Sequence, residues 1–373
     1  MFDHKLLLTA LRVPSTLATL PLSAWQGILT LGRRHGVSGR WYGQLSAAGL
    51  LEEVPAAVQR HLWSDQVVAA NHVRAARWEL NRLAHVFTTT GVSWTLLKGA
   101  AYIAAELPPG DHRLLSDVDI LVPEASLDVV EALLMDCDWR SPPHDEYDDH
   151  YYRAWMHELP PLQHRLRGTV LDVHHNILPR TSPRCPDAAE LIARRVPLPD
   201  GLFMLAPADA VLHSVLHGFW GGELTNCLRD VLDVHELVQT FGQRLGESFW
   251  LDLQTRAQAL QAVRPLLLAL HQAEKHFGTL LPPDFKRALK QSDRQWIPRA
   301  LTNALIGEVF LPTLPPNRRE KLALKALLLR SHLLKMPLRL LLPHLNYKLG
   351  QRLAARAKTR RKAAQKAQGK PAR

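Results

Sequence analysis

Ser116-Asp117-Val118-Asp119-Ile120-Leu121-Val122 is the stretch that decides the fold, because it joins two carboxylates to an apolar run. The run predicts a buried β-strand. Side chains alternate between the faces of a strand, so Asp117 and Asp119 point to the same face, about 7 Å apart. Two like charges this close resist burial unless a cation lies between them. The pattern therefore predicts a divalent metal site, with Mg²⁺ (or Mn²⁺) binding carboxylate oxygens together with phosphates.

A second stretch supplies groups that suit a phosphate. Residues 92–97 predict a buried strand, and Lys98-Gly99 follows it where the next helix begins. Backbone N–H groups at such a junction face an incoming phosphate, and Gly99 allows close backbone approach. Lys98 adds a positive charge, while Arg113 can pair with a carboxylate or with a phosphate.

A third carboxylate comes from Val170-Leu171-Asp172-Val173, where an unpaired charge inside an apolar strand would be costly. Beside the end of the first strand, Asp172 would complete a carboxylate triad. Two acids would hold one metal ion, all three a second, and Asp172 would also help to deprotonate an attacking hydroxyl. His174 falls on the same face, where it would contact substrate or orient Asp172; a buried structural histidine is an equal alternative.

Together, these motifs resemble the nucleotidyltransferase superfamily, which has the DNA polymerase β-like fold. The similarity is greatest to a bacterial group of uncharacterised nucleotidyltransferases, and it covers residues 65–240. The resemblance implies three catalytic metal ligands: Asp117, Asp119 and Asp172. It also implies that an NTP co-substrate binds around Lys98, Gly99, Arg113, Ser116 and His174.

The predicted function is metal-dependent transfer of a nucleoside monophosphate from an NTP to a hydroxyl or phosphate acceptor. The acceptor is open: a sugar, a small antibiotic-like molecule, a protein side chain or RNA. Related active enzymes usually have a serine after the glycine, whereas this chain has Gly99-Ala100. The alternative is therefore a binding or regulatory module that keeps the fold with weak or no turnover. Kinase loops of the GxxxxGK[ST], HRD or DFG type do not occur.

The predicted fold class is α+β, with a mixed β-sheet core flanked by helical regions at both ends. We expect an N-terminal helical region over 1–64, the core over 65–200, a helical domain over 201–345 and a basic tail over 346–373. Asp65 is predicted to begin a long helix that Gly91 ends, and residues 147–155 to form a further strand. Later helices are expected at about 207–216, 226–240, 247–276, 284–290 and 296–310.

Charge is distributed unevenly along the 373 residues, whose net charge is +11. The segment 321–373 has 15 Lys and Arg and no acidic residue, while the rest balances at −4. The tail is predicted to be disordered or at best helical. A solvated terminus, an anionic membrane surface and, less favoured, nucleic acid are its possible settings. Three scattered cysteines and the lack of a signal peptide or an apolar span favour a cytoplasmic protein, with peripheral membrane attachment as an option.

Two further pairs at helical spacing are open to two interpretations. Arg229 and Asp233 have the spacing of a helix ion pair, but Arg229 could instead reach a substrate phosphate. His213 and His217 could bind a metal, although packing towards the cleft is favoured because a metalloprotease glutamate is missing between them.

Overall fold

The computed structural model describes residues 4–143, 145–220, 227–293, 299–313 and 315–368. Within these residues the centre is a mixed sheet with strand order β3-β4-β5-β2-β1-β7-β6. Its strands are β1 (Thr95–Leu96), β2 (Asp117–Leu121), β3 (Trp139–Arg140), β4 (Leu162–His164), β5 (Val170–His174), β6 (Val196–Pro197) and β7 (Phe203–Met204). Parts of the predicted terminal regions and of the helices predicted over 226–240 and 296–310 lie outside the described residues. They are residues 1–3, 226, 296–298 and 369–373.

The two longest strands lie side by side at the middle of the sheet. β2 and β5 are parallel, and their register sets Asp119 opposite Asp172. β1 is antiparallel to β2 and parallel to β7. Parallel and antiparallel pairs thus occur in one sheet, which confirms the predicted α+β class with helical flanks.

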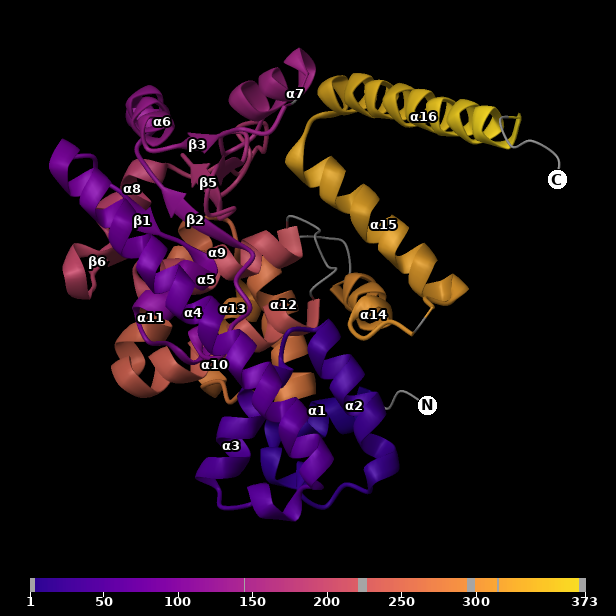
Figure 1. Cartoon of the computed structure of the whole chain (residues 1–373). Helices are drawn as coiled ribbons and strands as arrows, with labels where there is room; N and C mark the ends of the chain where they lie inside the picture. The colour runs from indigo at the N-terminus through magenta and orange to yellow at the C-terminus, as the bar shows by residue number, and fades with distance from the viewer. Residues whose placement is uncertain (1–3, 144, 221–226, 294–298, 314, 369–373) are drawn as a thin grey trace.

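Of the N-terminal helices, the first three form the lower end of the molecule in Figure 1, and the long fourth one reaches up to the sheet. They are α1 (His4–Arg12), α2 (Leu22–Arg34), α3 (Trp41–Ala47) and α4 (Ala56–Thr90). α4 ends where predicted, because Gly91 takes the left-handed conformation with φ of 68°. The predicted start at Asp65 is wrong. α4 begins nine residues earlier, and Asp65 lies within it, 2.9 Å from the Arg33 guanidinium of α2.

Helices cover the sheet and extend beyond it. Next to the sheet lie α5 (Lys98–Ala104), α6 (Leu127–Asp136), α7 (Glu146–His150) and α8 (Ala188–Ala193). The C-terminal half contains α9 (Pro207–Val215), α10 (Cys227–Leu245), α11 (Glu247–Ala259), α12 (Val263–Phe277), α13 (Pro283–Gln291) and α14 (Arg299–Val309). The single helix expected over 247–276 is two helices, since the chain turns at Gln261, whose φ is 51°. One buried hydrophobic cluster runs through both helical regions and the sheet. The domain borders expected from the sequence stay a prediction.

The strand predicted over 147–155 is wrong. This segment is α7 followed by a π-helical turn, Tyr151–Trp155. Asp145 caps it, since its carboxylate accepts the backbone N–H of Asp148 at 2.8 Å. Tyr147 and Tyr151, four residues apart on one helix face, both stack on His344. Aromatic residues, which are common in strands, recur in this segment at helical spacing.

The chain ends in an arm formed by α15 (Arg318–Lys335) and α16 (Leu338–Gln368), which lies to one side of the body in Figure 1. The tail is predicted to be disordered or at best helical, and its residues 346–368 continue α16. The Tyr347 ring stacks on Tyr147 of α7, with centroids 3.8 Å apart. Lys348 Nζ lies 2.5 Å from Asp148 Oδ1. Every described helix is too short or too polar to cross a membrane.

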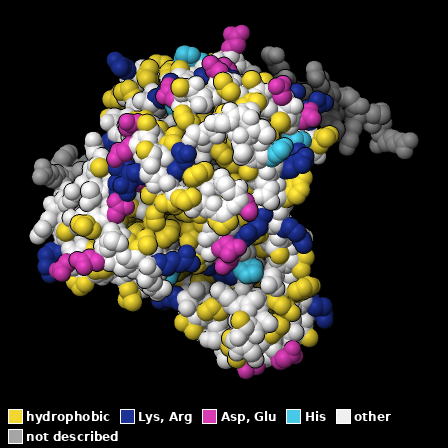
Figure 2. All heavy atoms as spheres, turned by 90° about the vertical axis from the view of Figure 1, so that its left-hand side faces the viewer, with side chains coloured by type: hydrophobic (Ala, Val, Ile, Leu, Met, Phe, Trp, Pro, Cys, Tyr) yellow, Lys and Arg dark blue, Asp and Glu magenta, His cyan; other side chains and the backbone are white. Residues whose placement is uncertain are grey.

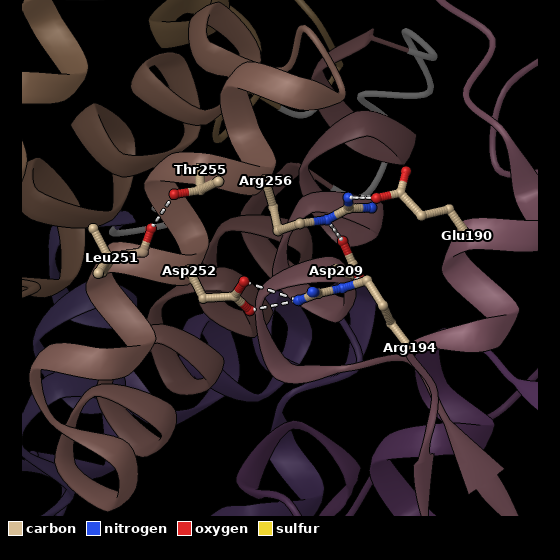
Figure 3. A network of polar contacts seen from close by, with 7 residues as sticks. All are labelled: Glu190, Arg194, Asp209, Leu251, Asp252, Thr255 and Arg256. Carbon is tan, nitrogen blue, oxygen red and sulfur yellow. Dashed lines mark hydrogen bonds and ion pairs between the residues drawn. The ribbon is translucent and has the colours of Figure 1, made fainter.

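A buried ion network joins α8 to the C-terminal helices (Figure 3). The Asp209 side chain is fully buried; its Oδ1 accepts from Arg256 Nε at 2.7 Å and its Oδ2 from Arg194 Nε at 3.1 Å. Arg194 also binds Asp252 at 2.8 Å, and Arg256 contacts Glu190. Both oxygens of the buried carboxylate are therefore occupied.

Candidate active site

The predicted site residues gather around one cavity of about 290 Å³, which lies between the sheet, α5 and α10. Its lining includes Lys98, Gly99, Arg113, Ser116, Asp117, Asp119 and Asp172. Of the predicted residues, only His174 is not part of the lining. Residues from three separate regions of the sequence thus line one cavity, whose volume is at the small end for ligand pockets.

Asp119 is the most strongly held carboxylate of the cavity. Its Oδ1 accepts from Lys98 Nζ at 2.8 Å and from His174 Nε2 at 3.0 Å. Burial alone would raise the pKa of Asp119, but the Lys98 charge and the His174 hydrogen bond hold it well below its usual range. Lys98 has φ of 44°, uncommon for a residue with a side chain. Because it is paired with Asp119, the Lys98 ammonium group already neutralises one acid of the cavity.

Asp172, on the neighbouring strand, has the opposite electrostatic setting. Burial, together with the negative charges of Asp119 and Glu158, raises the pKa of its carboxyl to about 7. Its Oδ1 is buried and has no hydrogen-bond partner in the described part of the chain. An orphaned buried carboxylate oxygen beside other acids is what a bound cation would satisfy. The donor set therefore fits a divalent metal ion.

Asp117 completes the group of three acids and is half-buried at the start of β2. Ser116 Oγ donates to its Oδ1 at 2.8 Å, so Ser116 orients this carboxylate. The third predicted ligand is thus held by a hydroxyl rather than by a positive charge.

Arg113 pairs with a carboxylate, one of its two predicted partners. Its guanidinium donates to Asp233 Oδ2 of α10 at 2.8 Å and to the Pro109 carbonyl at 3.2 Å. Gly99 makes room for this side chain, since a Cβ on Gly99 would lie 2.6 Å from Arg113 Nε. Ala100, where related enzymes have a serine, is fully buried and does not line the cavity. A role for Gly99 towards phosphate stays a prediction.

His174 is placed differently from what the sequence suggested. Its hydrogen bond goes to Asp119 and not to Asp172. The register pairs His174 with Leu121, so Asp119, two residues before Leu121, is its diagonal neighbour on β2. Its Nδ1 faces Glu158 Oε2 at 3.4 Å. Glu158 was missed by sequence reasoning, since it lies before β4 in an irregular segment without periodicity and meets His174 only through an isolated β-bridge.

A family model described as "Uncharacterised nucleotidyltransferase" matches residues 21–278. The chain belongs to this nucleotidyltransferase family. The match includes all three acids, Lys98 and α10, and ends just after α12, so that the arm of α15 and α16 lies outside it. No curated protein matches the chain. Membership indicates a nucleotidyl-transfer activity and binding of a nucleotide substrate.

α10 forms the wall of the nucleotidyltransferase cavity opposite the acids of the sheet. The spacing of Arg229 and Asp233 allowed an ion pair, but Asp233 instead binds Arg113, and Arg229 donates to the Leu114 carbonyl at 3.4 Å. Burial, and then the charge of Arg113, lowers the pKa of Arg229. Its Nε is buried without a hydrogen-bond partner in the ranges described. Arg229 thus lines the cavity as a cation whose guanidinium still has an unused donor.

Two more titratable groups line the cavity, Asp230 of α10 and His217. Asp230 has no hydrogen bond or ion pair with the residues that the structure describes, and burial, followed by the charge of Asp233, raises its pKa to about 7. His217 follows α9 in a π-helical turn, Leu216–Trp220, and burial lowers its pKa to about 3. His213 is buried one turn earlier, in accord with packing towards the cleft.

Proposed function

We propose that the chain is a metal-dependent nucleotidyltransferase, which moves a nucleoside monophosphate from an NTP to a hydroxyl or phosphate acceptor. The observation that carries the proposal is the parallel register of β2 and β5, which puts Asp119 opposite Asp172 at one cavity. Asp117 lies on the same strand two residues before Asp119. Three acids at one edge, facing cations on other elements, suit the transfer of a charged phosphoryl group.

Asp117, Asp119 and Asp172 would hold Mg²⁺ or Mn²⁺. The unpartnered Asp172 oxygen and the raised pKa of this acid support a cation at this point. When bound, a divalent ion supplies neutralisation of the phosphate charge and alignment of the reacting oxygens. Hard oxygen ligands are the kind that these ions select.

The chain's own side chains would then perform three tasks. Lys98 and Arg229 contact the triphosphate as point charge and as planar donor. Asp172, which has no cationic side-chain partner in the described chain, accepts the proton of the attacking hydroxyl. The acceptor oxygen forms a bond to the α-phosphorus, the bond from that phosphorus to the bridging oxygen breaks, and pyrophosphate leaves. Ser116 keeps Asp117 oriented throughout.

A transfer assay with labelled NTP and Mg²⁺ or Mn²⁺ tests the proposal. We expect label transfer by the wild type and its loss in Asp117→Ala/Asp119→Ala. Asp136→Ala is the matched control, because Asp136 is an exposed aspartate at the end of α6. Equal transfer by the double variant would overturn the assignment. Nucleotide binding without transfer to any acceptor would favour the module without turnover that Gly99-Ala100 suggested.

We further propose that α15 and α16 bind an anionic membrane surface. Leu342, Leu345, Leu349 and Leu353 recur at three- and four-residue spacing on α16, and all four are exposed. Further exposed leucines lie on α15, and no acidic residue follows Glu320. An apolar stripe within a basic segment complements anionic lipid. Tyr347 is the one aromatic residue of 321–373, so base stacking on nucleic acid has less support.

Flotation of the full chain with phosphatidylcholine vesicles, with or without phosphatidylserine, tests this surface. We expect binding only to the anionic vesicles and its loss in Leu342→Ser/Leu349→Ser. Leu251→Ser/Leu280→Ser is the control, since these leucines are exposed on other elements. On the face drawn in Figure 2 the Lys and Arg side chains are interspersed with Asp and Glu, so the body offers no single basic patch there. Equal flotation of both double variants would contradict the proposal.

A further inference from the structure

A second group of potential ligands lies beside the three acids, formed by His157, Glu158 and His174. Each offers one ligand atom, and these atoms all lie within 4.8 Å of one another. His157 and Glu158 come from the segment before β4, and Glu158 forms an isolated β-bridge with His174 at the end of β5. Two histidines and one carboxylate are a donor set of a different kind from the three aspartates.

Two ring nitrogens of this group lack partners. Nδ1 of His157 and Nδ1 of His174 are both buried, and neither has a hydrogen bond to the residues described. The His174 side chain is 1% exposed, so water does not replace the missing partner. Buried polar atoms are nearly always satisfied, and two orphans in one cluster indicate that something binds between them.

The hydrogen bond at Nε2 of His174 limits which group can bind at its Nδ1. Nε2 lies 3.0 Å from Asp119 Oδ1, and an ionised carboxylate only accepts, so Nε2 carries a proton. In the neutral ring Nδ1 then has a lone pair, which faces Glu158 Oε2 at 3.4 Å. Two acceptors this close repel each other unless a proton or a cation lies between them.

His157 decides between a proton and a metal cation. A proton on His174 Nδ1 would satisfy the contact with Glu158, but it would leave the His157 nitrogen without a partner. A neutral His157 ring has one nitrogen with a lone pair, and its Nδ1 is buried without a partner among the described residues. A metal ion accepts all three donors at once.

We propose that His157, Glu158 and His174 form a second cation site, which binds a divalent transition-metal ion of the Zn²⁺ class. Imidazole nitrogens favour such ions over Mg²⁺, and three protein ligands leave one position open. Tetrahedral ligands about 2.1 Å from an ion lie about 3.4 Å apart, which is the distance between His174 Nδ1 and Glu158 Oε2. The His157 ligand atom lies within 4.8 Å of both and would approach by side-chain rotation.

His174 would connect this ion to the transfer site. Metal-bound histidines commonly donate their other N–H to a carboxylate, which fixes the ring and its tautomer. Here that carboxylate is Asp119, so the ion would hold His174 as the donor that orients Asp119. This connection rests on the proposed function, whereas the ion site itself does not.

Binding of Co²⁺, a coloured substitute for Zn²⁺, to the metal-stripped full chain tests the site. We expect one equivalent of Co²⁺ with visible absorption bands, displaced by Zn²⁺. His157→Gln and Glu158→Gln should each lose the bands and weaken Zn²⁺ binding at least about 100-fold, since even outer-shell partners cost 10- to 100-fold. His85→Gln is the matched control, because His85 is exposed on α4. Thermal unfolding checks that each variant is folded.

Asp117→Asn distinguishes the two cation sites. We expect it to keep the Co²⁺ bands while it loses nucleotidyl transfer. Bands absent from the wild type, retained in both His157→Gln and Glu158→Gln, or lost in Asp117→Asn would each overturn the second site. Failure of the transfer assay with intact Co²⁺ bands would overturn only the proposed function.

Discussion

The Asp209 network and the Asp172 edge of the cavity are both buried acidic centres, but their hydrogen bonding is opposite. Both oxygens of Asp209 accept from arginines, within 3.1 Å (Figure 3). Asp172 Oδ1 is buried without a partner in the described chain, and its neighbours across the strand are further acids. A buried carboxylate whose two oxygens are both bonded stabilises the fold, whereas one with an unpartnered oxygen costs stability. The difference indicates which acids serve structure and which serve a ligand.

The largest expected effect comes from Asp172→Asn. It should lower nucleotidyl transfer at least about a thousandfold, because a ligand and a proton acceptor are lost together. The melting temperature should stay equal or rise, since a buried charge without a partner is removed. Labelled transfer and thermal unfolding measure the two quantities on one preparation. A large fall in melting temperature would show that Asp172 stabilises the fold as Asp209 does, and would contradict the difference proposed between the two acids.

Asp209→Asn should show the reverse pattern. Removing the charge leaves Arg256, which is 4% exposed, and Arg194 facing a neutral amide. Breaking a buried ion pair costs about 3–5 kcal/mol, so we expect a loss of that size in the free energy of unfolding. Urea denaturation measures it, and transfer per folded molecule should be unchanged. Asp136→Asn provides the control, and equal stability of both variants would contradict the structural role.

The sequence predicted the acids of the cavity better than their partners. Alternation along a strand placed Asp117 and Asp119 on one face, and two apolar strands with inward acids implied that Asp172 would join them. Spacing could not reveal that Asp233 of α10 binds Arg113, or that Glu158 faces His174, because such contacts depend on how distant segments pack. Local propensity also failed at 147–155, where tyrosines at helical spacing stack on His344.

Asp230, on the α10 side of the cavity, is a further buried acid, and its effect on stability should depend on pH. Its pKa is raised to about 7 from 3.8, so the folded chain holds this proton more tightly than the unfolded chain. The contribution of Asp230 to stability is therefore full below pH 4 and declines as the pH rises towards 7. Asp230→Asn lacks this decline. Its advantage over the wild type should grow by about 1–2 kcal/mol between pH 4 and about 7.5, allowing for partial exposure.

Denaturation of Asp230→Asn and the wild type at several pH values measures this difference. Asp136→Asn should follow the wild type at every pH. If the difference in free energy of unfolding between Asp230→Asn and the wild type were the same at every pH, Asp230 would have a partner in solution. It would then be a structural acid like Asp209.

The smallest expected effect on stability is at the contact between α7 and α16. This contact contains an ion pair, as the Asp209 network does, but it lies at the surface. Ring contacts and ion pairs at exposed positions contribute little to global stability, so Tyr347→Ala should leave the midpoint of urea denaturation close to that of the wild type. Loss of the ring stacked on Tyr147 should instead free the arm locally. Limited proteolysis should then cleave between α15 and α16 several times faster than in Leu349→Ala, the control on the same helix. Equal cleavage rates would mean that the ion pair between Lys348 and Asp148 holds α16 without the ring, and that charge rather than stacking positions the basic helix.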